Sequence, residues 1–127
     1  MFKEDEIKEL YTLFNEEDIA SDSKLRYINN KIKKHGYLYI NISELNYLNY
    51  KKNIKIKYDV TKLKTIFKNK SIGYTSIIKN LNIPKSTLSK LFNNDRNVKL
   101  YQLNNLFEKA NEVYDLKLSK EVIKEGE

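Results

Sequence analysis

The residues of this chain best suited to chemistry follow its single proline, Pro84, in the stretch NIPKSTLSKLFNNDRN at residues 82–97. Four basic or hydroxyl side chains share one face of the helix that Pro84 can open, spaced i, i+1, i+4 and i+5: Lys85, Ser86, Ser89 and Lys90. Leu88 and Leu91 fall on the opposite face, where they can hold the helix against a core. Lysine donates hydrogen bonds to guanine O6 and N7, and serine donates or accepts them. Such a face is therefore suited to the major groove of a nucleic-acid duplex.

Catalytic and metal chemistry find little support in the rest of the sequence. His35 is the only histidine, and because Gly36 follows it, the pair is typical of a helix end. The adjacent side chains of Glu16, Glu17 and Asp18 diverge, which is typical of a solvated acidic patch. There is no cysteine, and the three glycines form no phosphate-binding loop. We therefore expect no enzyme, no metal site and no cofactor.

The net charge of +7 is unevenly distributed along the chain. Residues 1–20 hold two basic and seven acidic side chains, and residues 111–127 hold three and five, which gives −5 and −2. Residues 21–58 hold nine basic and two acidic side chains, and residues 59–110 hold ten basic and three acidic ones, so each block carries a net charge of +7. A basic surface suggests a polyanionic partner, and the alternative is a solvated lysine-rich surface. Three of the lysines are expected to be solvated: Lys62, Lys64 and Lys79.

The composition, with 40% hydrophobic and 32% charged residues in 127, is typical of one folded domain or a small domain with an appendage. No run approaches the roughly 18 apolar residues of a membrane span, and the acidic start MFKEDEIKEL does not resemble a signal peptide. Together with the lack of cysteine, this predicts a cytoplasmic protein with no membrane partner. Asn, Lys, Ile and Tyr are abundant, and their AT-rich codons indicate a bacterial or mobile-element source.

Helical periodicity is clearest from Asp59 onward, and Asp59 itself can cap a first helix. A second helix over residues 74–81 is followed by Asn82, a residue type that tolerates the left-handed conformation at a helix end. Pro84 suits the first turn of a third helix, where its missing N–H would be unpaired anyway. The turn between the second and third helices predicts a helix-turn-helix corner. A fourth helix carries apolar residues at helical spacing: Leu100, Leu103, Leu106, Phe107 and Ala110.

The N-terminal half mixes helical and strand patterns. Helices are expected over residues 3–15 and in the following stretch, where Ser21, Asp22 or Ser23 can cap a second helix that ends near His35 and Gly36. The stretches YLYINI at residues 37–42 and IKIKY at residues 54–58 predict strands, with one or two helical turns between them. Four tyrosines of this half are expected to pack or to form an interface: Tyr37, Tyr39, Tyr47 and Tyr50.

These patterns predict a mainly α protein with two parts. Residues 1–57 would form a small α+β accessory or dimerisation unit. Residues 59–127 would form a four- to five-helix bundle containing the helix-turn-helix. Residues 111–127 are expected to extend the fourth helix or to add a short terminal one.

The stretch IGYTSIIKNLNIPKSTLSKLFNNDRNVKLYQLNNLFEKA, residues 72–110, resembles the Cro and phage-repressor type of helix-turn-helix domain. The matching elements are Ile77-Ile78 before Leu81, the turn Asn82-Ile83, the STLSKL helix, the corner Asn93-Asn94 and the LYQLNNLFEKA helix. With the helix from Asp59, the resemblance covers about half the chain. The family usually has alanine at Ile78, glycine at Asn82 and Asn94, and often proline at Val98. Asparagine can adopt the same backbone as those glycines.

The resemblance implies how the site residues are used. Base contacts are expected from the outer face of the third helix: Lys85, Ser86, Ser89 and Lys90. Phosphate contacts are expected near the start of the second helix and around the third: Tyr74, Thr75, Thr87, Asn93 and Arg96. A helix N-terminus offers unpaired N–H groups and a positive dipole end to an anion, which agrees with the phosphate role.

The resemblance also implies sequence-specific binding of double-stranded DNA by a transcriptional repressor or regulator of a phage, plasmid or bacterial operon. Such domains usually act as homodimers that read half-sites about one DNA turn apart. Two alternatives stay open. A plasmid partition or relaxosome accessory factor would bind tandem DNA repeats and recruit a partner. A mobile-element inhibitor of the anti-CRISPR type would bind a protein partner through residues 1–57 and keep the helix-turn-helix for self-regulation.

Overall fold

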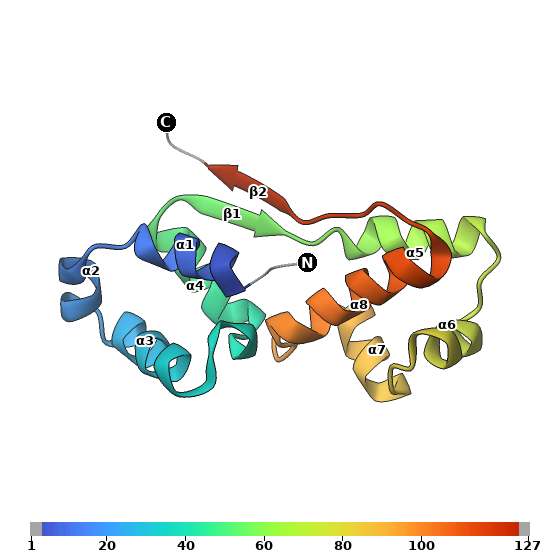
Figure 1. The fold of residues 1–127 in the computed structure, drawn as a ribbon, viewed down its shortest axis with the longest axis horizontal. Coiled ribbons are helices and arrows are strands. Elements are labelled where there is room, and N and C mark those ends of the chain that lie inside the picture. The colour runs from blue at the N-terminus through green and yellow to red at the C-terminus, as the bar shows by residue number, and fades with distance from the viewer. Residues whose placement is uncertain (1–3, 125–127) are drawn as a thin grey trace.

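The computed structural model describes residues 4–124, with the backbone alone at residues 55–57 and 122–124. Eight α-helices, one 3-10 turn and two strands make up this described part (Figure 1). The first elements are α1 (Glu4–Thr12), α2 (Glu16–Ser21), α3 (Ser23–His35), η1 (Tyr37–Tyr39), α4 (Ile42–Lys51) and β1 (Ile54–Lys57). The remaining ones are α5 (Val60–Asn69), α6 (Tyr74–Leu81), α7 (Lys85–Phe92), α8 (Leu100–Tyr114) and β2 (Glu121–Lys124). The expectation of a mainly helical protein is confirmed.

The small α+β unit predicted for the N-terminal half is not formed. Residues 37–42 were predicted as a strand, but they form η1 and the start of α4. Local hydrogen bonds explain the difference. The side chain of Asn41 accepts the N–H of Glu44 at 2.8 Å, and the Glu44 carboxylate accepts the N–H of Asn41 at 3.2 Å. This reciprocal capping box starts a helix where the aromatic and β-branched composition alone favoured a strand.

The strand predicted at IKIKY is present as β1, but its partner comes from the other end of the chain. β2 pairs antiparallel with β1, so that Ile54 lies opposite Lys124 and Lys57 lies opposite Glu121. The expectation that the last residues continue α8 or add a helix is therefore wrong within the described part. Helix α8 ends at Tyr114, because Asp115 adopts a left-handed conformation with φ 53°. The chain then runs back over the top of the molecule in Figure 1 to reach β1.

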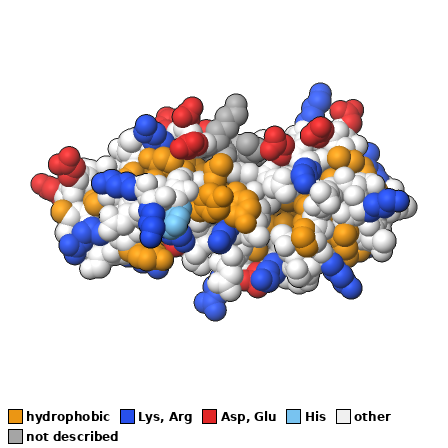
Figure 2. Space-filling model, turned by 60° about the horizontal axis from the view of Figure 1, so that its bottom comes forward, with side chains coloured by type: hydrophobic (Ala, Val, Ile, Leu, Met, Phe, Trp, Pro, Cys, Tyr) orange, Lys and Arg blue, Asp and Glu red, His pale blue; other side chains and the backbone are white. Residues whose placement is uncertain are grey.

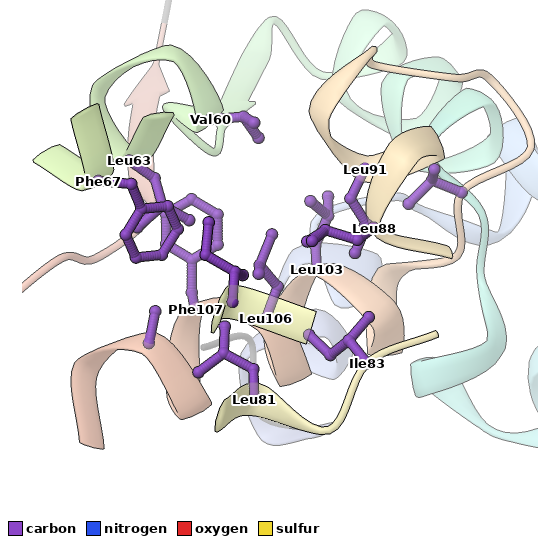
Figure 3. Close-up of a cluster of buried hydrophobic side chains, with 13 residues drawn as sticks. Val60, Leu63, Phe67, Leu81, Ile83, Leu88, Leu91, Leu103, Leu106 and Phe107 are labelled. Atoms are coloured by element: carbon purple, nitrogen blue, oxygen red, sulfur yellow. The ribbon is translucent and has the colours of Figure 1, made fainter. Parts of the chain in front are cut away.

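Two clusters of buried hydrophobic side chains form the core. One lies among α5, α6, α7 and α8 (Figure 3) and contains Val60, Leu63, Phe67, Ile77, Leu81, Ile83, Leu88, Leu91, Val98, Leu103, Leu106, Phe107 and Ala110. The other gathers α1, α3, α4 and β1 and contains Ile7, Leu10, Phe14, Leu25, Ile28, Ile32, Ile40, Leu45, Leu48, Ile54 and Leu100. Leu100, the first residue of α8, thus packs in the second cluster. No helix in the described part has both the length and the apolar character to cross a membrane.

The two halves of the chain are joined by backbone hydrogen bonds as well as by the β1–β2 pair. The N–H of Ile42 donates to the carbonyl oxygen of Val98 at 3.0 Å, and the N–H of Leu100 donates to that of Ile40 at 2.8 Å. Asn41 and Lys99 lie opposite each other in this short antiparallel bridge. The start of α8 is therefore held directly against the segment between η1 and α4.

Candidate nucleic-acid interface

Helices α6 and α7 are joined by a short turn at Asn82 and Ile83. Asn82 lies in the left-handed region, with φ 52° and ψ 46°, and its N–H donates to the carbonyl oxygen of Ile78. The N–H of Ile83 donates to the same oxygen at 3.3 Å. These bonds close the end of α6. Pro84 then stands just before α7 with φ −57°, and the helix begins at Lys85.

The inner face of α7 is fixed by two leucines. Leu88 is 0% exposed and Leu91 is 1% exposed, as their spacing predicted. In Figure 3 their side chains point toward Leu103 of α8. The helix is short, so this burial is what determines which of its faces is turned to solvent.

The outer face of α7 carries the expected contact residues, but not all are equally accessible. Lys85, Ser86 and Lys90 are exposed. Ser89 is half-buried, and its hydroxyl oxygen accepts a hydrogen bond from the Asn93 side-chain amide at 3.4 Å. Thr87 is also half-buried. Lysines at each end of the helix, with Ser86 beside the first, therefore form the part of this face that is open to a partner.

Helices α6 and α7 begin without a side-chain cap, unlike α2, α3, α4 and α5. Each of α2, α3, α4 and α5 has a side chain that accepts a first-turn N–H: Asn15, Asp22, Asn41 and Asp59. Gly73 and Pro84 occupy this position in α6 and α7, and neither can supply such an acceptor. The first turns of α6 and α7, with Thr75 exposed in the former, are therefore open to an anion.

The remaining expected phosphate contacts fall into two places. The Tyr74 ring meets the Phe92 ring edge-on, with centroids 6.0 Å apart, so the start of α6 lies against the end of α7. Asn93 follows Phe92 directly and is exposed, which brings Tyr74 and Asn93 into one region. Arg96 lies farther along the loop that follows α7, on the side of α4. Its carbonyl oxygen accepts a bond from the Ser43 hydroxyl at 3.5 Å, and the residue lines a groove beside α4.

Charge is unbalanced around α5, α6 and α7. Residues 60–94 contain no aspartate or glutamate and seven lysines: Lys62, Lys64, Lys68, Lys70, Lys79, Lys85 and Lys90. The ion pairs among the described side chains all involve other lysines. They are Lys31–Glu44 at 2.8 Å, Lys51–Asp22 at 3.2 Å, Lys52–Asp18 at 3.1 Å and Lys120–Glu6. Part of the positive charge of the N-terminal half is thus neutralised internally, whereas that of residues 60–94 faces solvent without a described carboxylate partner.

One lysine has a structural role that its sequence position does not reveal. Lys64 of α5 was expected to be solvated; it is exposed, and its ammonium group also donates to the carbonyl oxygen of Phe92 at 3.3 Å. A cation at the last carbonyls of a helix is stabilising. The bond joins α5 to the end of α7, and only the packing of the two helices could reveal it.

Among the described residues, no group of three or more His, Cys, Asp or Glu side chains gathers to hold a metal ion. His35 is exposed at the end of α3, where the N–H of Gly36 donates to the carbonyl oxygen of Ile32 at 2.8 Å. The chain matches no family model, no curated protein and no solved structure. The likeness of residues 72–110 to the Cro and phage-repressor type stays a prediction from the sequence.

Proposed function

We propose that this chain binds double-stranded DNA in a sequence-specific manner by inserting α7 into the major groove. The observation that carries the proposal is the outer face of α7, on which Lys85, Ser86 and Lys90 are exposed while Leu88 fixes the helix from behind. These side chains are of the types that bind base edges. The biological role that fits is a repressor or regulator of transcription in a bacterium, phage or plasmid, acting in the cytoplasm.

The surroundings of α7 support a duplex as the partner. The uncapped first turns of α6 and α7 offer N–H groups to phosphates, and the exposed side chains of Thr75 and Asn93 add hydrogen-bonding groups at the edges. The seven lysines of residues 60–94 supply the positive field, with no carboxylate in that stretch to repel phosphate. As a homodimer, the protein would place two copies of α7 in half-sites about one DNA turn apart.

The test is a paired titration on an operator and on a scrambled duplex at fixed salt. The operator is first located by footprinting the protein on DNA that flanks its own gene. Ser86→Ala removes no charge, so we expect it to weaken operator binding by about 1 kcal/mol or less and to leave scrambled binding nearly unchanged. Lys90→Ala should weaken both, with the larger loss on the operator.

Lys70→Ala is the matched control, because Lys70 is exposed just after α5 and lies outside the turn and α7. It should weaken both duplexes equally and change the salt slope by no more than about one unit. An operator-to-scrambled ratio that survives both Ser86→Ala and Lys90→Ala would show that α7 does not read the sequence. Absence of any salt-sensitive duplex binding by the unchanged protein would refute the proposal as a whole.

A further inference from the structure

Basic side chains on the face that carries α7 continue into the N-terminal half. Helices α3 and α7 both lie along the lower side of the molecule in Figure 1, and Figure 2 brings that side forward. In Figure 2, lysine and arginine side chains spread over both halves; most acidic side chains lie along the upper edge and at the left end, and a few lie lower down among the basic ones. We propose that the end of α3 and the segment beside it bind the phosphate backbone of the same duplex, flanking the bases that α7 reads. This inference rests on the proposed function.

The contact region, which we call the flank surface, consists of Lys33, Lys34, His35, Tyr39, Lys99 and Tyr101. All six residues are exposed. The single histidine, His35, is visible near the middle of Figure 2, with basic side chains on one side and an apolar patch on the other.

The charge of the flank surface is not used inside the protein. Helix α3 contains no acidic residue, and Lys33 and Lys34 have no carboxylate partner among the described residues. Lys31 on the same helix is different, because it pairs with the buried Glu44 at 2.8 Å. The negative end of the helix dipole tolerates the cations at this end of α3, and their exposed ammonium groups are complementary to phosphate.

Two tyrosines meet where η1, which follows the charged end of α3, lies against the first turn of α8. Tyr39 is 48% exposed and Tyr101 is 39% exposed, and their ring centroids are 5.2 Å apart. The two residues flank the bridge that pairs Asn41 with Lys99. Tyrosine hydroxyls are regular donors to DNA phosphates. Phenols bordered by lysines therefore fit a polyanionic backbone better than they fit an apolar protein surface.

The flank surface is also held in place relative to α7. The hydrogen bonds from Ile42 to Val98 and from Leu100 to Ile40 lock the segment after η1 onto the start of α8. Leu100 is 0% exposed in the cluster that gathers α1, α3, α4 and β1, and other residues of α8 pack in the cluster that holds α7. A second contact built this way would protect backbone to one side of each α7 site and would add affinity without adding base specificity.

The experiment compares two double variants on duplexes whose flanks are shortened stepwise around the located operator. Lys33→Ala with Lys34→Ala removes two charges from the flank surface. Lys8→Ala with Lys117→Ala is the matched control. It removes two exposed charges, one from α1 and one from the segment after α8, which runs over the top of the molecule in Figure 1. Hydroxyl-radical footprints and salt slopes are measured for both.

We expect the flank-surface variant to lose backbone protection on one flank, to become insensitive to shortening of that flank, and to keep its operator-to-scrambled ratio. Its slope of log affinity against log salt should fall by about 1.8, at about 0.9 for each phosphate that the protein no longer neutralises. The control should keep the flank protection. Tyr39→Phe with Tyr101→Phe keeps both rings and should reduce the protection in part.

An unchanged flank footprint in the Lys33→Ala and Lys34→Ala protein would overturn the inference. So would a Tyr39→Ala and Tyr101→Ala protein that becomes monomeric with the flank protection intact, because the patch would then be an interface between two copies. In either case the α7 variants can still lose specificity, so the proposed function would survive. If the unchanged protein binds no duplex, the proposed function fails too.

Discussion

The packing of α7 against the core allows the effect of truncating one of its side chains on the free energy of unfolding to be predicted. Leu88 is 0% exposed in the cluster among α5, α6, α7 and α8. Truncation to alanine removes three carbons, worth about 2.4 kcal/mol at about 0.8 kcal/mol each. The cavity left behind adds to this, because neighbours such as Leu103 relax only in part. We therefore expect Leu88→Ala to lower the free energy of unfolding by about 3–4 kcal/mol.

Urea denaturation followed by far-UV circular dichroism measures this loss as a shift of the midpoint at a constant m-value. Two variants serve as controls. Ser86→Ala lies two residues away on the exposed face and should change the free energy by no more than about 0.5 kcal/mol. Leu88→Met keeps the volume nearly constant and should cost less than about 1.5 kcal/mol.

A loss of about 0.5 kcal/mol or less for Leu88→Ala would refute the assignment of faces on α7. Such a value is typical of surface positions. The helix would then be rotated about its axis, and Lys85, Ser86 and Lys90 would not form the outer face on which the proposed function depends.

Three further predictions concern other parts of the chain. The Tyr11 hydroxyl is buried without a described hydrogen-bond partner, and burial is the main reason that its pKa is raised to about 12. Removing this hydroxyl in Tyr11→Phe should therefore raise the free energy of unfolding by about 1 kcal/mol in the same urea assay. A clear loss of stability in Tyr11→Phe would contradict this prediction. Asp22 caps α3, and its pKa is lowered to about 2 by the Tyr47 hydroxyl and also by Leu25 N–H and Lys51. Because the pKa of this carboxyl in the unfolded chain is about 3.9, the stabilisation that it gives is present above about pH 4 and is lost as the pH falls toward 2. The free energy of unfolding, measured from pH 6 to pH 2, should therefore fall less steeply for Asp22→Asn than for the unchanged protein. Identical pH profiles of the two proteins would argue against the hydrogen bonds of the Asp22 carboxylate. Asn82 has φ 52°, so Asn82→Gly should be tolerated, whereas Asn82→Val should cost about 1–2 kcal/mol, and equal stabilities would show that the turn does not need a left-handed residue.

Much of the C-terminal half could be predicted from the sequence because its signals are local. The apolar residues of α5, α6, α7 and α8 recur at helical spacing, and each helix meets a residue that ends it, such as Asn82 after α6. The same spacing determined that Leu88 and Leu91 are buried. Placing Lys85, Ser86 and Lys90 on the opposite face then required only the geometry of one helix.

The sequence-based predictions were wrong where two local preferences of the same residues competed, or where a strand pairs with a segment distant in the sequence. Residues 37–42 have strand composition, but the capping box of Asn41 and Glu44 satisfies the backbone locally and a helix results. β1 was visible as a strand, but its partner β2 follows it by more than 60 residues. No periodicity in residues 111–127 indicates that pairing, because it depends on contacts made when the chain folds back.

The tertiary structure alone decided which charges are available. The sequence carries equal positive charge in residues 21–58 and 59–110, but it does not show which lysines meet a carboxylate. Folding pairs Lys31 with Glu44, Lys51 with Asp22 and Lys52 with Asp18, and it leaves the lysines of α5, α6 and α7 without such partners among the described residues. The physical reason is that Coulomb attraction depends on distance in space, and residues far apart in the chain come within a few ångströms of each other only after the helices have packed.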